Sequence, residues 1–264
     1  MLNCSFFAKP MYYICFAINR DMRQSTFLLL CFFWVFGSVS AQTEKTDSLR
    51  NALANAKSDI DKAQLLNSLA DQYKQSDPKQ MLAFANQALS LSQKLHFAAA
   101  EGNAYLNIGN ANIISGNYPE ALRSFANAQT VFEKEQDTNP TKEIKTALAR
   151  AYGSIGIVFS EQSNYARALQ YHLKAVRIYE ALGDLNKCAR VYNNIGIVYK
   201  AQNDNFRALE YFTKCLKAQE KTGDETLGIT TTNIGNVYLA QKNYPKALEY
   251  YTKARSLFEK FPNP

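Results

Sequence analysis

The chain has 264 residues, 47% of them hydrophobic, with only 11 glycines and 7 prolines. A chain of this length and apolarity can bury a sizeable core, so the composition argues against disorder and favours a helix-rich fold. The 30 basic and 23 acidic residues leave a net charge of +7, but no five lysines or arginines follow one another. This balance indicates an ordinary solvated surface, and we expect no nucleic-acid partner.

The N-terminal segment, residues 1–41, is predicted to lie outside the folded domain. Its second half has the three parts of a secretory signal peptide: the basic residue Arg23, an apolar stretch over residues 27–36, and small residues at 39–41. The apolar stretch is shorter than the roughly 20 residues that span a bilayer. We therefore expect an exported, periplasmic protein whose mature chain has no stable membrane span, with an uncleaved anchor as the alternative.

A separate hypothesis concerns residues 1–21, which precede the basic part of the signal peptide and match none of its parts. We hypothesise that translation starts at Met22 and that the preceding segment comes from a mis-assigned start. A peptide from within that segment on the mature protein would refute this. Residues 42–61 are then predicted to form an N-terminal helix or linker before the main domain.

The main domain, residues 62–261, repeats one phrase, which reads "SIGIVFSEQ", "NIGIVYKAQ" and "NIGNVYLAQ", with a fainter copy "NIGNANIIS". The glycines of the four copies are spaced by 47, 40 and 39 residues: Gly109, Gly156, Gly196 and Gly235. Apolar residues around them recur at spacings of three and four, which is helical. Twelve residues after each glycine comes an alanine, and an aromatic residue or histidine follows four residues later. Self-similarity at such a period indicates a stacked array of helix pairs.

Five such units are predicted, each with two helices and a short turn. Their approximate bounds are 62–97, 98–137, 142–183, 184–223 and 224–261. Glycine followed by aspartate at 183–184 and at 223–224 is expected to end one helix and cap the next. Seven extra residues near Asn139 account for the longest spacing, and we expect them to interrupt the stack.

The small residues of the repeat have a physical explanation. Two antiparallel helices approach closely only where small side chains let their surfaces meet, and the aromatic residue fills the space beside that contact. His172 stands at one of these aromatic positions, so we expect a hydrogen-bonded packing role for it and no catalytic one. Cys188 and Cys215 have no metal-binding spacing and stand at small-residue positions, so we expect buried free thiols.

One complete unit shows the whole pattern of large, small and aromatic residues, in the order Tyr192, Ile195, Gly196, Tyr199, Ala208 and Phe212. This pattern resembles the tetratricopeptide repeat (TPR), and the resemblance covers about residues 62–261. It implies an all-α fold, a right-handed superhelical α-solenoid of about five helix-turn-helix TPR units. The leader followed by such repeats is also similar to the N-terminal TPR region of Bacteroidota signalling proteins, in which a histidine kinase or DNA-binding domain often follows.

The resemblance implies that the first helix of each unit lines a concave groove for a peptide or protein ligand. The residues expected there are Asn103, Leu106, Asn107, Asn110, Arg150, Ile157, Arg190, Asn193, Asn194, Ile197, Lys200, Thr232, Asn233 and Asn236. The basic residues and neighbouring amides among them suit an acidic peptide. Alternatively, some of these asparagines cap or bridge adjacent helices.

No catalytic constellation is present in the sequence, which has two histidines and neither a P-loop nor a GxSxG or HExxH motif. We therefore predict a non-enzymatic protein without metal or cofactor. The leading interpretation is an exported protein-interaction scaffold. The alternative is the TPR sensor region of a truncated or split signal-transduction protein, of the histidine kinase or DNA-binding regulator type. An enzyme or a cell-wall-acting protein is the third interpretation, but it would need converging acid and base groups.

The last predicted unit ends in apolar residues, Leu257, Phe258 and Phe261, with no polar helix after them. Stacked arrays usually end in a polar capping helix, because the final pair otherwise exposes an apolar face. We therefore expect self-association through this uncapped C-terminal unit.

Overall fold

The structure is a computed structural model that describes residues 44–261 of the chain. The chain divides into two compact units, Met1–Ser48 and Leu49–Pro264. The second unit contains all the predicted repeats. The predicted signal peptide and the predicted start at Met22 lie outside the described residues, so both stay predictions.

The second unit is built from pairs of helices, whose members we call first and second helices. The first helices are α2 (Asp59–Gln72), α4 (Ala98–Ile114), α6 (Lys142–Glu161), α8 (Leu185–Ala201) and α10 (Leu227–Ala240). The second helices are α3 (Pro78–Lys94), α5 (Tyr118–Thr138), α7 (Tyr165–Ala181), α9 (Asn205–Thr222) and α11 (Tyr244–Lys260). Residues 44–55 are also helical, a 3-10 turn η1 (Tyr73–Gln75) follows α2, and residues 44–261 contain no strand. The predicted all-α solenoid is confirmed.

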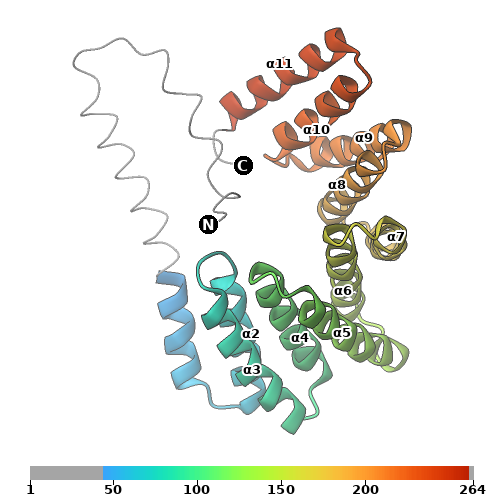
Figure 1. The fold of residues 1–264 in the computed structure, drawn as a ribbon. Coiled ribbons are helices and arrows are strands. Elements are labelled where there is room, and N and C mark those ends of the chain that lie inside the picture. Colours follow the sequence, from blue (N-terminus) through green and yellow to red (C-terminus); the bar gives the residue numbers. More distant parts are fainter. Residues whose placement is uncertain (1–43, 262–264) are drawn as a thin grey trace, which may run out of the picture. The chain divides into compact units, whose positions relative to one another are not determined.

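The order of the helices in space follows the order in the chain. Each helix from α2 to α11 packs against the next one (Figure 1). Consecutive first helices also touch one another directly, α2 with α4, α4 with α6, α6 with α8 and α8 with α10. Across residues 44–261 the second helices have no comparable contacts with one another. The first helices therefore form a continuous row in which equivalent residues of neighbouring repeats lie side by side.

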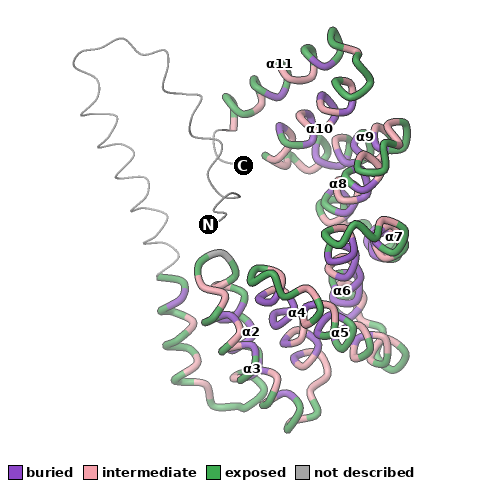
Figure 2. The backbone as a smooth tube through the Cα atoms, viewed as in Figure 1, coloured by how far each residue is buried: buried purple, intermediate pink, exposed green. Residues whose placement is uncertain are grey.

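The glycines of the repeat allow the two helices of a pair to meet. A Cβ atom added to Gly196 of α8 would lie 2.6 Å from the ring of Phe212, which is fully buried on α9. The same contact recurs between Gly109 of α4 and Phe125 of α5, at 2.4 Å. Both distances are too short for two carbon atoms, so any larger residue would push the helices apart. The predicted close approach is confirmed, and buried residues gather where the paired helices face each other (Figure 2).

The helix ends follow the predicted capping chemistry fully at one unit boundary and in part at the next, where Gly223 ends α9 with a left-handed φ of 67° as predicted. Gly183 has a left-handed φ of 66°, and the Asp184 side chain then caps α8 by accepting a hydrogen bond from the backbone N of Lys187 at 3.1 Å. The prediction for Asp224 is wrong, because α10 starts later, after Thr226. The Asp224 carboxylate instead accepts hydrogen bonds from the backbone N and the hydroxyl of Thr226, at 2.8 and 2.6 Å. It closes a turn before the helix.

The seven extra residues near Asn139 do not interrupt the stack as predicted. They lengthen the two helices on either side, so α5 has 21 residues and α6 has 20. The two helices still pack against each other, and one hydrophobic core continues across α5, α6, α7 and α8. The insertion therefore adds helix length on both sides of the turn while the order of packing is kept.

Candidate functional site

The residues predicted to line a ligand groove lie on the first helices. We define the first-helix face as five residues from each of α4, α6, α8 and α10, at equivalent places around the aligned glycine. They are Asn103, Leu106, Asn107, Asn110 and Ile113; Arg150, Gly153, Ser154, Ile157 and Ser160; Arg190, Asn193, Asn194, Ile197 and Lys200; and Ile229, Thr232, Asn233, Asn236 and Leu239. Three of these residues are basic and none is acidic, so the face carries a net positive charge.

Two pairs of asparagines join adjacent first helices. The Asn107 amide on α4 donates to the backbone oxygen and the side-chain oxygen of Asn67 on α2, at 3.1 and 3.3 Å. The Asn233 amide on α10 donates to the side-chain oxygen of Asn193 on α8, at 3.0 Å. Each pair spans 40 residues, so both pairs join equivalent places in neighbouring repeats. For these four residues the structure shows the bridging arrangement that the sequence left as an alternative.

Other polar residues of the face are bonded within their own repeat. The Asn103 amide donates to the backbone oxygen of Ala99 at 2.8 Å, and the side-chain oxygen of Asn236 accepts a hydrogen bond from the Tyr251 hydroxyl at 2.8 Å. Leu106 is only 1% exposed and the bridging Asn107 only 3%, so these two offer almost no surface to a ligand. Thr232 is likewise bonded, through its hydroxyl, to a backbone oxygen of its own helix.

By contrast, the amides of Asn110 and Asn194 form no hydrogen bond with any residue of the described part of the chain. Asn194 occupies the same place on α8 that Asn233 occupies on α10. The residue opposite Asn233 is Asn193, but the equivalent residue opposite Asn194 is Gly153, which has no side chain to accept a hydrogen bond. The side-chain amide of Asn194 is therefore unpaired at the seam between α6 and α8.

The cations of the face are also unpaired. Arg150 and Arg190 are exposed, and neither they nor the half-buried Lys200 form a hydrogen bond or ion pair within residues 44–261. Burial raises the pKa of the Tyr179 hydroxyl to about 12, while the positive charges of Arg150 and Arg190 act on that hydroxyl in the opposite direction. The charges of both arginines, one on α6 and one on α8, thus act on this hydroxyl, and the nearby Asp184 carboxylate acts against them.

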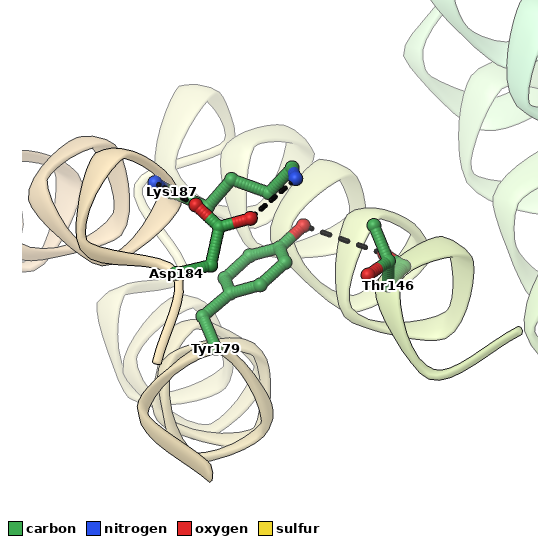
Figure 3. Close-up of polar contacts among 4 residues, drawn as sticks. All are labelled: Thr146, Tyr179, Asp184 and Lys187. Atoms are coloured by element: carbon green, nitrogen blue, oxygen red, sulfur yellow. Dashed lines mark hydrogen bonds and ion pairs between the residues drawn. The ribbon is translucent and has the colours of Figure 1, made fainter. Parts of the chain in front are cut away.

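Tyr179 itself was not among the predicted site residues, and it supports the corner where α6, α7 and α8 meet. Its hydroxyl donates to the backbone oxygen of Thr146 on α6 at 3.5 Å (Figure 3). The Lys187 ammonium of α8 lies 5.8 Å from the centre of its ring and forms an ion pair with Asp184 at 2.5 Å. A backbone oxygen of α6 and side chains of α7 and α8 thus hold this corner in place. The sequence does contain a signal for Tyr179. It follows the buried Phe132 by 47 residues, which is also the spacing of the first two aligned glycines, so the two aromatic residues hold the same place in their repeats.

Aliphatic side chains of the face are exposed in a regular pattern. Ile157 on α6 and Ile197 on α8 are 37% and 45% exposed, at equivalent places in adjacent repeats. Ile229 and Leu239 on α10 are each 46% exposed. Exposed apolar side chains at equivalent places in adjacent repeats leave apolar surface on the first-helix face. The first-helix face therefore combines exposed apolar side chains, unpaired cations and the unpaired amides of Asn110 and Asn194.

His172 corrects one prediction. It is fully buried and packs against Gly156 on the facing helix, as the aromatic residues of the other pairs do. It is not hydrogen-bonded, because neither ring nitrogen has a partner among the described residues. Burial lowers the pKa of His172 to about 4, so the ring is neutral at physiological pH. A neutral, enclosed ring has a packing role.

The remaining reactive groups do not form a site in the described part of the chain. Cys188 and Cys215 are buried, and burial raises the pKa of each thiol to about 11. Within residues 44–261, no three His, Cys, Asp or Glu side chains gather as a metal site requires. Nor does any helix of that range have both the length and the apolarity to cross a bilayer.

Two segments of the chain match models of a known protein family. Residues 147–221 and residues 231–261 match family models described as tetratricopeptide repeat. The first segment contains the unpaired amide, both arginines and the exposed isoleucines of α6 and α8. The chain is therefore a TPR protein, as its repeated phrase predicts. A comparison with curated protein sequences finds no match.

Solved structures agree on the fold. BtubC (BKLC) from P. vanneervenii is 19% identical, with a TM-score of 0.68 over 86% of this chain and 93% of that one. A STAND signal-transduction ATPase with a TPR sensor from Pyrococcus horikoshii is 17% identical, with a TM-score of 0.67 over 82% of this chain and 33% of that one. A Rap protein in complex with competence and sporulation factor is 14% identical, with a TM-score of 0.66 over 86% and 73%.

At these identities the similarity shows the fold alone. The TPR fold is in general a scaffold for protein interactions, in which stacked helix pairs present an extended surface. This protein is thus an all-α solenoid of the TPR type, a protein-interaction scaffold.

Proposed function

We propose that the protein is an exported, non-catalytic scaffold that binds a peptide or protein along its first-helix face. The observation that carries the proposal is the recurrence of exposed isoleucines, Ile157 and Ile197, beside the unpaired Arg150 and Arg190. Groups that are neither buried nor paired within the chain remain free to contact a second molecule. The absence of acidic residues from the same face favours an acidic partner.

The spacing of the first helices suits an extended ligand. Packed helices lie about 8–10 Å apart, and an extended chain rises about 3.3 Å per residue. A peptide that crosses the row would therefore place about every third residue over the next first helix. Ile157 and Ile197 would each contact one apolar residue of such a peptide, because they hold equivalent places on α6 and α8.

Selection from a library of random dodecapeptides displayed on phage tests this function. Peptides that bind the wild-type chain are synthesised, and their affinities are measured by fluorescence anisotropy. The double variant Ile157→Asp/Ile197→Asp should lose binding, because it replaces both apolar contacts with charge. The matched control is Phe206→Asp on α9, a residue 81% exposed and outside the face, and it should bind as the wild type does. Selected peptides that bind both variants equally would contradict the proposal.

A sensor role is the second candidate. One solved relative carries its TPR array as the sensor of a larger signalling ATPase, and another is complexed with a signalling factor. If this chain is the sensor region of a truncated or split signalling protein, a kinase or DNA-binding output domain should be encoded in the same or an adjacent reading frame. Intact mass of the protein from fractionated native cells tests this together with export. A periplasmic mass that starts at Gln42 supports the scaffold, and a larger membrane-bound species supports the sensor.

Self-association through the last pair is a further part of the proposal. Leu248 on α11 is 68% exposed, whereas the equivalent Leu209 on α9 is half-buried and packs in the cluster that contains residues of α10. A second copy could cover Leu248 in the same way. Size-exclusion chromatography with light scattering should show dimers for the wild type and monomers for Leu248→Asp, and a monomeric wild type would contradict this part.

A further inference from the structure

We propose that the seam between α6 and α8 selects the ligand by taking an acidic side chain, Asp or Glu, that has an aliphatic neighbour in the peptide. The central seam is defined by Arg150, Gly153 and Ile157 of α6 with Arg190, Asn194 and Ile197 of α8. The inference rests on the proposed function and deepens it, because it names the residues that select the ligand and the chemistry that they select.

The first argument is the break in the pairing of asparagines. The seam between α2 and α4 is joined by Asn67 and Asn107, and the seam between α8 and α10 by Asn193 and Asn233. In the register of those pairs, Asn194 of α8 should meet its partner at position 153, where the chain has glycine. The seam therefore keeps an amide donor and acceptor for a ligand, and an extended peptide backbone offers both complements.

Gly153 differs from the glycines that allow paired helices to meet. A Cβ atom at Gly153 would have only one neighbour within 4 Å, the Cβ of Ala175 at 4.0 Å. The close approach of α6 and α7 thus does not require glycine there, in contrast to Gly156, where an added Cβ would lie 2.6 Å from the His172 ring. Glycine at position 153 leaves space on the face instead.

The second argument is charge. Arg150 lies three residues before Gly153 on α6, so the two residues share a face of that helix. Arg190 lies four residues before Asn194 on α8, so these two also share a face. Both charges act on the hydroxyl of Tyr179 at the corner of α6, α7 and α8, where the Asp184 carboxylate acts in the opposite direction. Neither is neutralised by an ion pair within residues 44–261. Two unpaired guanidinium groups on adjacent first helices suit a carboxylate, to which each can donate two hydrogen bonds.

The third argument is the apolar flank. Ile157 follows Gly153 by four residues and Ile197 follows Asn194 by three, so each isoleucine lies one turn beyond the polar centre of the seam. Their exposed fractions of 37% and 45% leave apolar surface for a neighbouring residue of the ligand. The seam thus fits an acidic residue in its centre and an aliphatic residue beside it.

The probe for this test is a fluorescein-labelled peptide with Thr-Glu-Leu repeated four times, and its control has glutamine in place of glutamate. Binding to the full chain is followed by fluorescence anisotropy. The glutamate peptide should bind about tenfold more tightly than the glutamine peptide, and added salt should reduce the difference. Arg150→Gln/Arg190→Gln should abolish the preference. Arg123→Gln/Arg255→Gln, which removes the same charge from exposed arginines of α5 and α11, should keep it.

The pairing argument has its own variants. Gly153→Asn supplies the missing partner of Asn194, so it should raise the melting temperature of the protein. The same change should lower the affinity for the peptide about tenfold. Asn194→Ala should lower the affinity for the peptide without lowering the melting temperature of the protein. Asn67→Ala on α2, outside the first-helix face, breaks the existing pair with Asn107, so it should lower the melting temperature and leave peptide affinity unchanged.

Three results would each overturn the inference. The first is equal affinity for the glutamate and glutamine peptides, and the second is an equal loss of the preference for glutamate in both arginine double variants. The third is wild-type peptide affinity in both Gly153→Asn and Asn194→Ala. Library peptides that depend on Ile157 and Ile197 but not on the arginines would leave the proposed function standing while the inference fails. A library that yields no peptide for the wild-type chain would remove both.

Discussion

Replacing His172 with phenylalanine should stabilise the protein and reduce its sensitivity to acid. His172 is fully buried in α7 against Gly156, and neither ring nitrogen has a hydrogen-bond partner among residues 44–261. Phe125 and Phe212 fill the equivalent places in other pairs, so a phenyl ring fits the available shape. Removing unsatisfied polar atoms from such a site should add about 1–3 kcal/mol to the free energy of unfolding.

The pH dependence follows from the pKa of His172, which burial lowers from 6.5 to about 4. As the pH falls below 6.5, the unfolded chain takes up a proton on this histidine, while the folded protein takes it up only as the pH approaches 4. The unfolded state binds more protons in this interval, so the free energy of unfolding decreases as the pH falls. At ~1.4 kcal/mol per pKa unit, the full loss is about 3 kcal/mol.

Urea unfolding followed by far-UV circular dichroism, at pH values from neutral to about 4.5, measures this difference. Protonation of carboxylates changes the free energy of unfolding of both proteins in the same way. This contribution therefore cancels when His172→Phe is compared with the wild type. His96→Asn is the control, because it removes the chain's other histidine from an exposed turn with a positive φ of 52°, which asparagine tolerates. Parallel pH profiles for the wild type and His172→Phe would refute the reasoning.

Two further predictions concern stability. Gly196→Ala should cost about 1–3 kcal/mol, because its Cβ would meet the Phe212 ring at 2.6 Å, whereas Gly153→Ala should be neutral or stabilising by up to about 1 kcal/mol. Calorimetric melting that ranks these two variants in the opposite order would show that the pairing of helices is misplaced. Tyr192→Phe removes a hydrogen bond of 2.6 Å to Glu180 and should cost about 0.5–1.5 kcal/mol in urea unfolding, and an unchanged midpoint would mean that this bond does not stabilise the junction between repeats.

The pairing of helices could be predicted from the sequence because each unit repeats its small and aromatic residues in one register. Gly196 and Phe212 meet as that register requires. The effect of the insertion could not be predicted in the same way, since Pro140 and its polar neighbours suggest a loop. The helical periodicity continues on both sides, so α5 and α6 lengthen instead. Similarly, the place of His172 follows from the repeat, but its lack of a partner depends on what the facing helix presents.

For the candidate site, the sequence predicts which positions share the first-helix face but not which of them remain available. Asn107, Asn194 and Asn233 hold the same place in their repeats, and the sequence alone treats them alike. Only the register between adjacent first helices shows that two of them are bonded and one is not. That register depends on how closely the helices pack, and this cannot be derived from the spacing within one repeat.

The same comparison explains how one repeated position can serve either stability or binding. An asparagine at this place stabilises the array where the preceding repeat presents another asparagine, as Asn193 does for Asn233. Where the preceding repeat presents glycine, the identical amide has no partner among residues 44–261 and is free for a ligand. Arginines then flank that one seam, and no acidic residue of the face neutralises them. The residue that decides the role of each asparagine is therefore the one on the neighbouring helix, so a substitution at Gly153 should change binding more than its small size suggests.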